Sequence, residues 1–100
     1  VNPTRDGLNL VAKEGTALSE RHGALLLSSG AGAIEELRGT CDEVDPFDVS
    51  ATAAALADAL DRGPEERRAQ WAARRDRAVQ RDAGAWLRDQ LAAASPATAR

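Results

Sequence analysis

The stretch at residues 5–14, RDGLNLVAKE, most constrains what this chain can fold into, because it has the layout of a loop that turns directly into a helix. Asp6 and Gly7 suit a turn, since glycine accepts backbone angles that other residues avoid. The residues after Asn9 contain no helix breaker, so we expect a helix at Leu10–Leu18. The start of a helix has unpaired N–H groups and a partial positive charge, which makes it a natural site for an anion.

Two carboxylates flank this predicted anion site. Leu10 and Glu14 are four residues apart and therefore lie on one face of the helix. A phosphate at the helix start would leave Glu14 within reach of the next group along a ligand, such as a ribose. Asp6 would point at whatever lies on the other side of the phosphate. The alternative from the pattern alone is an ordinary helix start, with Asp6 near the cap and Glu14 in solvent.

Composition favours a soluble globular chain and argues against several functions. Of the 100 residues, 43% are hydrophobic and 29% charged, and the net charge of −3 gives no general basic field for nucleic acid. Cys41 is the single cysteine, so no disulfide framework or cysteine metal cluster is expected, and we predict that it is buried. No apolar run approaches the ~20 residues of a membrane span. We expect a cytoplasmic protein, and no metal role for His22 in its polar turn.

The rest of the chain alternates between predicted strands and helices. Residues 24–28 form a continuous apolar run that fits a strand buried on both faces, although periodicity alone does not exclude a buried helix. The other predicted elements are a short helix at 31–38, a weak strand at 40–44 and helices at 49–62, 65–81 and 85–94. Alternating strands and helices favour an α/β fold with a parallel sheet.

The three C-terminal helices carry different apolar patterns. The helix at 49–62 has a stripe of Val49, Ala53, Leu56 and Leu60. The helix at 65–81 has a narrow apolar face, and we expect its basic side chains to be solvated and paired with interleaved acids, the alternative being docking against an acidic domain that is absent here. These basic residues are Arg67, Arg68, Arg74, Arg75, Arg77 and Arg81. The helix at 85–94 concentrates Trp86, Leu87 and Leu91 on one side.

Two separate stretches are predicted to converge on one rim of the sheet. Ligands of open parallel sheets bind outside the carboxyl ends of the strands, which is where both the opening motif and residues 30–33 should lie. The small side chains at 30–33 permit close backbone approach, either to a neighbouring segment or to a ligand.

Residues 6–14, DGLNLVAKE, resemble the donor-binding motif DGMNLVAKE of the trehalose-6-phosphate synthase family of GT-B glycosyltransferases. Residues 27–37 are similar to the family's LSEFAGAAxEL, residues 45–48 to its NPYD or NPWD, and residues 64–68 to its LEERR. Trp86 falls where the last helix of the family carries a tryptophan. The similarity runs in order from about residue 5 to residue 91. Because the chain begins at Val1 on such a motif, we expect a segment of a longer protein.

The resemblance implies the C-terminal part of a Rossmann-like nucleotide-sugar domain, at residues 1–63. Helices at a domain boundary would follow at 64–94 and a tail at 95–100. It also implies a retaining enzyme that moves a hexose from UDP- or GDP-glucose to a sugar phosphate without a metal or other cofactor. The family's donor-sugar contacts fall on Asp6, Gly7, Leu8 and Asn9, its phosphate contacts on Leu10 and Val11, and its ribose contact on Glu14. No catalytic residue is assigned in this segment. The upstream domain and a second copy of the chain are the expected macromolecular partners.

Three departures from the family pattern keep other activities open. Gly15 stands where an aromatic is usual, Ser29 and Gly30 replace Glu-Phe, and Asp45 replaces Asn before Pro46. One alternative is a pseudo-glycosyltransferase of the validamycin type, which couples a GDP-cyclitol to an aminocyclitol phosphate through nitrogen. Another is a glucosylglycerol-phosphate synthase. A third, of a different class, is a non-catalytic nucleotide-binding regulatory domain.

Overall fold

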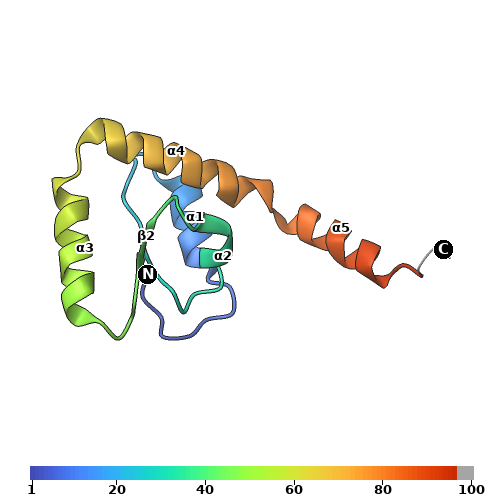
Figure 1. Ribbon diagram of the computed structural model, residues 1–100. Coiled ribbons are helices and arrows are strands. Elements are labelled where there is room, and N and C mark those ends of the chain that lie inside the picture. The colour runs from blue at the N-terminus through green and yellow to red at the C-terminus, as the bar shows by residue number, and fades with distance from the viewer. Residues whose placement is uncertain (97–100) are drawn as a thin grey trace.

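The chain alternates helix and strand and then ends in three consecutive helices, in the order predicted from the sequence (Figure 1). The computed structural model describes residues 1–96, so residues 97–100 of the predicted tail lie outside the described residues. The elements are α1 (Leu10–Leu18), β1 (Leu26–Ser28), α2 (Ile34–Leu37), β2 (Asp42–Val44), α3 (Val49–Asp61), α4 (Pro64–Gln80) and α5 (Ala83–Ala94). The predicted short helix at 31–38 is reduced to α2, because residues 30–33 form a loop instead.

The two strands pair in parallel, with Leu27 opposite Glu43. The other edge of β1 is also occupied. The Val1 amino group donates to the Leu26 carbonyl at 3.0 Å, and the Ser28 N–H donates to the Val1 carbonyl at 3.1 Å. This is the hydrogen-bond pattern of a parallel pair, so Val1 covers part of the outer edge of β1 in this two-stranded sheet. The predicted α/β class with a parallel sheet is confirmed.

The core lies between the helices and one face of the sheet. Leu27, Ile34 and Leu37 are at most 2% exposed, and small side chains such as Ala12 and Ala78 fill the space between them. Ala78 belongs to α4, which packs across α1 and α2 (Figure 1). The helix that carries the opening motif is therefore held between the sheet and α4.

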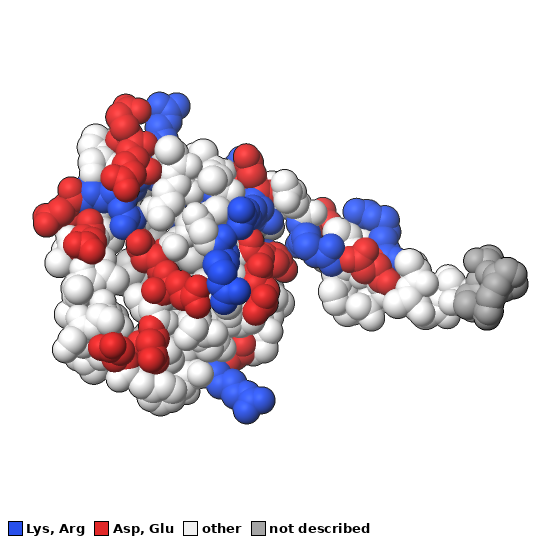
Figure 2. All heavy atoms as spheres, in the orientation of Figure 1, with Lys and Arg blue, Asp and Glu red and all other residues white. Residues whose placement is uncertain are grey.

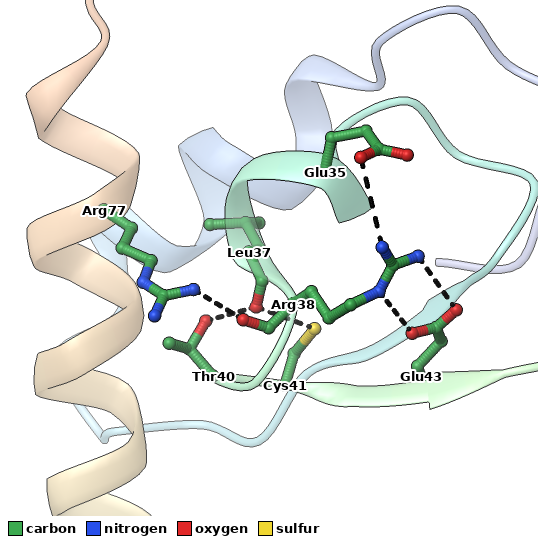
Figure 3. A network of polar contacts seen from close by, with 7 residues as sticks. All are labelled: Glu35, Leu37, Arg38, Thr40, Cys41, Glu43 and Arg77. Carbon is green, nitrogen blue, oxygen red and sulfur yellow. Dashed lines mark hydrogen bonds and ion pairs between the residues drawn. The ribbon is translucent and has the colours of Figure 1, made fainter.

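Polar contacts fix the turn that joins α2 to β2. The Thr40 hydroxyl donates to the Leu37 carbonyl at 2.5 Å, which closes the end of the helix. Arg77 reaches over from α4 and donates to the Arg38 carbonyl at 2.5 Å, while the Arg38 side chain pairs with Glu43 at 3.0 Å (Figure 3). This ion pair raises the pKa of Arg38. The turn is thus tied both to β2 and to α4.

Arg74 contradicts the expectation that the basic residues of α4 are solvated. It is 1% exposed and donates to three oxygens, at 3.0 Å to Thr16 Oγ1, 3.1 Å to the Thr40 carbonyl and 2.6 Å to the Gly23 carbonyl. Burial lowers the pKa of Arg74. The reason for the error is tertiary. Helix α1 and two separate turns present oxygens to one point on α4, and sequence periodicity carries no information about them.

The apolar stripe predicted for α3 is largely exposed in the described residues. Val49, Leu56 and Leu60 are 81%, 50% and 82% exposed, and Ala59 is the one residue of α3 that is buried. The periodicity was a correct sign of a helix, but the two described strands form too narrow a sheet to cover the stripe. Arg62, just after α3, anchors this region instead through a two-pronged pair with Asp42, with both contacts at 2.9 Å.

The last helix extends away from the rest of the molecule (Figure 1). It begins at Ala83, two residues earlier than predicted, because the Asp82 carboxylate caps it by accepting the Ala85 N–H at 2.8 Å. Trp86 and Leu91 are 60% and 61% exposed, so within residues 1–96 the apolar side of this helix is not covered. The placement of α5 at a domain boundary stays a prediction.

The surface of the molecule carries charges of both signs (Figure 2). Acidic and basic side chains are interleaved over the face in view and along the terminal helices, without one sign prevailing (Figure 2). Within residues 1–96, no helix is both long enough and apolar enough to cross a membrane.

Candidate functional site

The candidate site is the loop that leads into α1, and Asp6 organises it. One oxygen of the Asp6 carboxylate accepts the Leu8 N–H at 3.2 Å, and the other accepts the Asn9 side-chain amide at 3.1 Å. The side chain is only partly buried. Asp6 therefore shapes the loop by itself, whatever else it binds. The Leu8 N–H, which the resemblance placed at the donor sugar, is already engaged by this carboxylate.

Asn9, rather than Gly7, makes the sharp turn into the helix. Its φ of 74° lies in the left-handed region, which asparagine tolerates better than most residues, whereas Gly7 has no positive φ. The Asn9 side-chain oxygen then caps α1 by accepting the Ala12 N–H at 3.0 Å. The predicted turn at Asp6 and Gly7 is present, since Asp6 accepts the Leu8 N–H across it, but the positive φ lies at Asn9 and not at Gly7.

The loop at residues 28–33 holds the opening loop in place. The Asp6 N–H donates to the Gly30 carbonyl at 2.9 Å, the Gly32 N–H donates to the Asp6 carbonyl at 2.8 Å, and the Ala33 N–H donates to the Leu8 carbonyl at 2.6 Å. The two stretches thus meet, as predicted. The small residues serve a neighbouring segment here, which was one of the two possibilities.

Both glycines of that loop are required by close backbone contact. A Cβ on Gly32 would lie 1.9 Å from the Gly7 carbonyl oxygen, and a Cβ on Gly30 would lie 2.2 Å from the Thr4 carbonyl oxygen. Real Cβ atoms do not come so near to backbone, so any side chain at either position would displace the opening loop.

The start of α1 presents free N–H groups. Within residues 1–96, the amides of Gly7, Asn9, Leu10 and Val11 have no hydrogen-bond partner, while the Ala12 amide is capped by Asn9. Leu10 and Val11 are 56% and 64% exposed, so the start of the helix lies at the surface. Four free donors at the positive end of a helix suit a phosphate.

Glu14 is exposed one turn further along α1, on the same face as Leu10. Asp6 and Glu14 therefore lie at the two ends of the row of free amides. The structure brings all the residues predicted for the site together on one loop and helix start. The role of each in binding stays a prediction.

Sequence reasoning missed Lys13, which lies in the motif beside Glu14. Its ammonium is 2.8 Å from Glu36 Oε2 in α2 and donates to the Arg81 carbonyl after α4 at 3.0 Å. Both partners are remote in sequence, so no local pattern could have indicated them. A lysine among apolar residues of a helix was the one available signal.

Comparison with known proteins identifies the family. Residues 1–95 match the model of glycosyltransferase family 20. The chain belongs to this family. It is 43% identical over 93 residues to a trehalose-6-phosphate synthase of Sinorhizobium fredii, covering 91% of this chain and 20% of that protein. It is 40% identical over 90 residues to the validamine 7-phosphate valienyltransferase of Streptomyces hygroscopicus subsp. jinggangensis, covering 90% of this chain and 18% of that protein.

Solved structures of family 20 members have the same fold. A structure from E. coli bound with UDP-2-fluoro glucose superposes with a TM-score of 0.86 at 38% identity. A UDP-forming α,α-trehalose-phosphate synthase from Burkholderia xenovorans, in complex with glucose-6-phosphate, superposes with a TM-score of 0.86 at 35% identity. Each comparison covers 93% of this chain and 21% of the other. The family 20 chain described here thus spans about a fifth of the length of these relatives.

Proposed function

We propose that this chain is part of a retaining glycosyltransferase that transfers a hexose from UDP- or GDP-glucose to a sugar-phosphate acceptor, as a trehalose-6-phosphate synthase does. The observation that carries the proposal is the row of free amides at the start of α1 between Asp6 and Glu14. Membership of glycosyltransferase family 20 supports it, as do the UDP-sugar and glucose-6-phosphate bound in similar structures.

The proposed roles follow the order of the groups in a nucleotide sugar. Asp6 binds hydroxyls of the donor sugar, and the backbone of Gly7, Leu8 and Asn9 lines the sugar. The amides of Leu10 and Val11 bind the diphosphate, and Glu14 holds the ribose. The Leu8 N–H already donates to Asp6, so its part is to orient that carboxylate.

Charge stabilisation is the chemistry that this segment supplies. As the bond to the sugar breaks, negative charge grows on the diphosphate leaving group. Fixed backbone N–H groups at a helix start stabilise that charge without reorganising. We propose that they act together with upstream basic residues and without a metal ion or other cofactor. The enzyme is proposed to work in the cytoplasm.

A second candidate is a pseudo-glycosyltransferase that joins a GDP-cyclitol to an aminocyclitol phosphate by a C–N bond. The similarity to validamine 7-phosphate valienyltransferase favours it. Gly30 is one of the departures from the synthase pattern. The related motif has phenylalanine there, whereas in this chain even a Cβ would meet the Thr4 carbonyl oxygen. The loop before Asp6 therefore sits closer to residue 30 than an aromatic side chain would allow.

One assay separates these readings. The whole protein is incubated with UDP-glucose or GDP-glucose and glucose 6-phosphate, and separately with a GDP-cyclitol and an aminocyclitol phosphate. Release of UDP or GDP with formation of the coupled product is measured. Glucosyl transfer supports the first proposal, and C–N coupling supports the second. Nucleotide binding without turnover in any pair would instead indicate a regulatory domain.

A further inference from the structure

Lys13 joins three elements at one point. It lies in the first half of α1, and its ammonium contacts the Glu36 carboxylate of α2 and the Arg81 carbonyl at the end of α4. The Lys13 and Glu36 side chains are only 15% and 26% exposed. Partly desolvated ion pairs are more strongly coupled than surface pairs, and a lysine is well placed at the negative end of a helix such as α4.

Lys13 lies next to the residues of the candidate site. Lys13 is adjacent to Glu14 and two residues after Val11, so it shares a helical turn with the proposed ribose and phosphate contacts. It also lines, with Leu8, Leu10 and Trp86, an apolar groove of about 320 Å³ between the opening loop and the start of α5. A shift of α1 at Lys13 would therefore move the free amides and Glu14 together.

The other side-chain hydrogen bonds of α1 lie at the two ends of the helix. Asn9 fixes the first turn to the loop, and Thr16, which donates to the Ala12 carbonyl at 2.9 Å and accepts from Arg74, fixes the far end. Between these ends, Lys13 provides the polar contact from α1 to α2. We propose that Lys13 is a positioning residue, which holds α1 against α2 and α4 at the height where the nucleotide sugar binds. This inference rests on the proposed function of the same site.

The test uses the whole protein and compares stability with donor affinity. Lys13→Met removes the ammonium and leaves the Glu36 carboxylate without it, so the melting temperature falls. The KM for the nucleotide sugar is expected to rise about fivefold or more, with the acceptor KM changed less than about twofold. The Kd for UDP or GDP, measured by calorimetry, is expected to rise with the donor KM.

A double variant distinguishes positioning from stability. Lys13→Met with Glu36→Met removes both charges, and apolar residues often replace a buried ion pair without loss of stability. The melting temperature is then expected to recover while the donor KM stays high, because the specific tie to the Arg81 carbonyl is still missing. A donor KM that recovers with the melting temperature would overturn the proposal.

Arg62 offers a matched control, because its pair with Asp42 is similarly buried, at 11% and 22% side-chain exposure, but does not involve α1. Arg62→Met is expected to lower the melting temperature and leave the donor KM unchanged. An equal rise of donor KM in this variant would also overturn the proposal. If wild type binds UDP or GDP but transfers no sugar, the proposed function fails and the Kd values alone decide the role of Lys13. If it binds neither nucleotide, both fail.

Discussion

Arg74 donates its Nε–H to the Thr16 hydroxyl at 3.0 Å, and Thr16 in turn donates to the Ala12 carbonyl within α1. A buried cation on α4 is thus connected to the helix of the candidate site through one hydroxyl. Trp71, one turn earlier on α4, reinforces this contact by donating its indole N–H to the Thr16 carbonyl at 3.1 Å. These two side chains help to fix the position of α1 along α4.

Arg74→Ala is expected to lower the free energy of unfolding by about 2–4 kcal/mol, because it leaves the buried carbonyl of Thr40 without its donor, breaks the partly buried bond to the Gly23 carbonyl and opens a cavity. Denaturant titration of the whole protein measures it. The control is Arg75→Ala. Arg75 is exposed and lies 5.9 Å from the Trp71 ring, so its loss should cost about 1 kcal/mol or less. Equal losses would show that the buried contacts of Arg74 contribute nothing special.

Glu14→Ala is expected to weaken binding of the nucleotide sugar by about 1.5–3 kcal/mol, the scale of hydrogen bonds to a charged group. The melting temperature without ligand should hardly change, because Glu14 is exposed. Calorimetry with UDP-glucose and GDP-glucose provides the measurement. Glu20→Ala, another exposed glutamate just beyond α1, is the control and should bind as wild type does. An affinity that Glu14→Ala leaves intact would remove the ribose assignment.

Gly32→Ala should abolish or strongly reduce donor binding, because the new Cβ would force the Gly7 carbonyl, 1.9 Å away, to move. Gly15→Ala is the matched control in the same region. It lies in α1 with no atom within 4 Å of the added Cβ, so it should stabilise the protein by up to about 1 kcal/mol. Calorimetric affinity and melting temperature are measured for both. Wild-type affinity in Gly32→Ala would mean that the loop contact does not shape the site.

Stability is expected to decline at alkaline pH through Cys41. Burial raises the pKa of this thiol above its ordinary value of 9.0. The folded protein holds the thiol proton more tightly than the unfolded chain, so the stabilisation is complete below 9.0 and is lost as the pH rises through the higher folded-state pKa. The melting temperature of wild type should therefore fall more steeply in this range than that of Cys41→Ala. Parallel curves would indicate an exposed thiol.

Trp86→Ala should lower turnover with less effect on nucleotide affinity, if α5 packs against another part of the whole protein. The large exposed side chains on α5 form an apolar patch that the described residues leave in solvent. Small-angle scattering of the whole protein should then show a looser arrangement in the variant. Unchanged turnover and scattering would mean that α5 has no role at a domain boundary.

The sequence was most informative where a local pattern decides the structure. The apolar run before Ser28 predicted a strand, and the opening motif predicted both the loop and the helix start. It failed where distant groups decide. Arg74 was placed in solvent, because its three acceptors lie in α1 and in two turns, which only the fold brings together. The positive φ of this loop lies at Asn9, whereas the sequence pattern indicated Gly7, because glycine is the commoner residue at a positive φ.

Cys41 shows an intermediate case. It was predicted to be buried, and the structure leaves it half-buried, with its thiol donating to the Leu37 carbonyl at 3.6 Å (Figure 3). Composition alone indicates that a lone cysteine avoids water, but not how fully a turn will cover it. At the site, the sequence motif predicted which residues lie in the loop and which in the first turns of the helix. It did not predict the contacts of Lys13, because both partners are remote in sequence.

The contacts of Gly30 and Gly32 with the opening loop bear on any attempt to transplant the motif. Residues 5–14 look like an independent motif, but three of their backbone hydrogen bonds are made to residues 30–33. A graft of the motif alone onto another scaffold would include the ligand-facing groups but not residues 30–33, which hold the loop in its conformation. A working graft would have to include both segments and the strand between them.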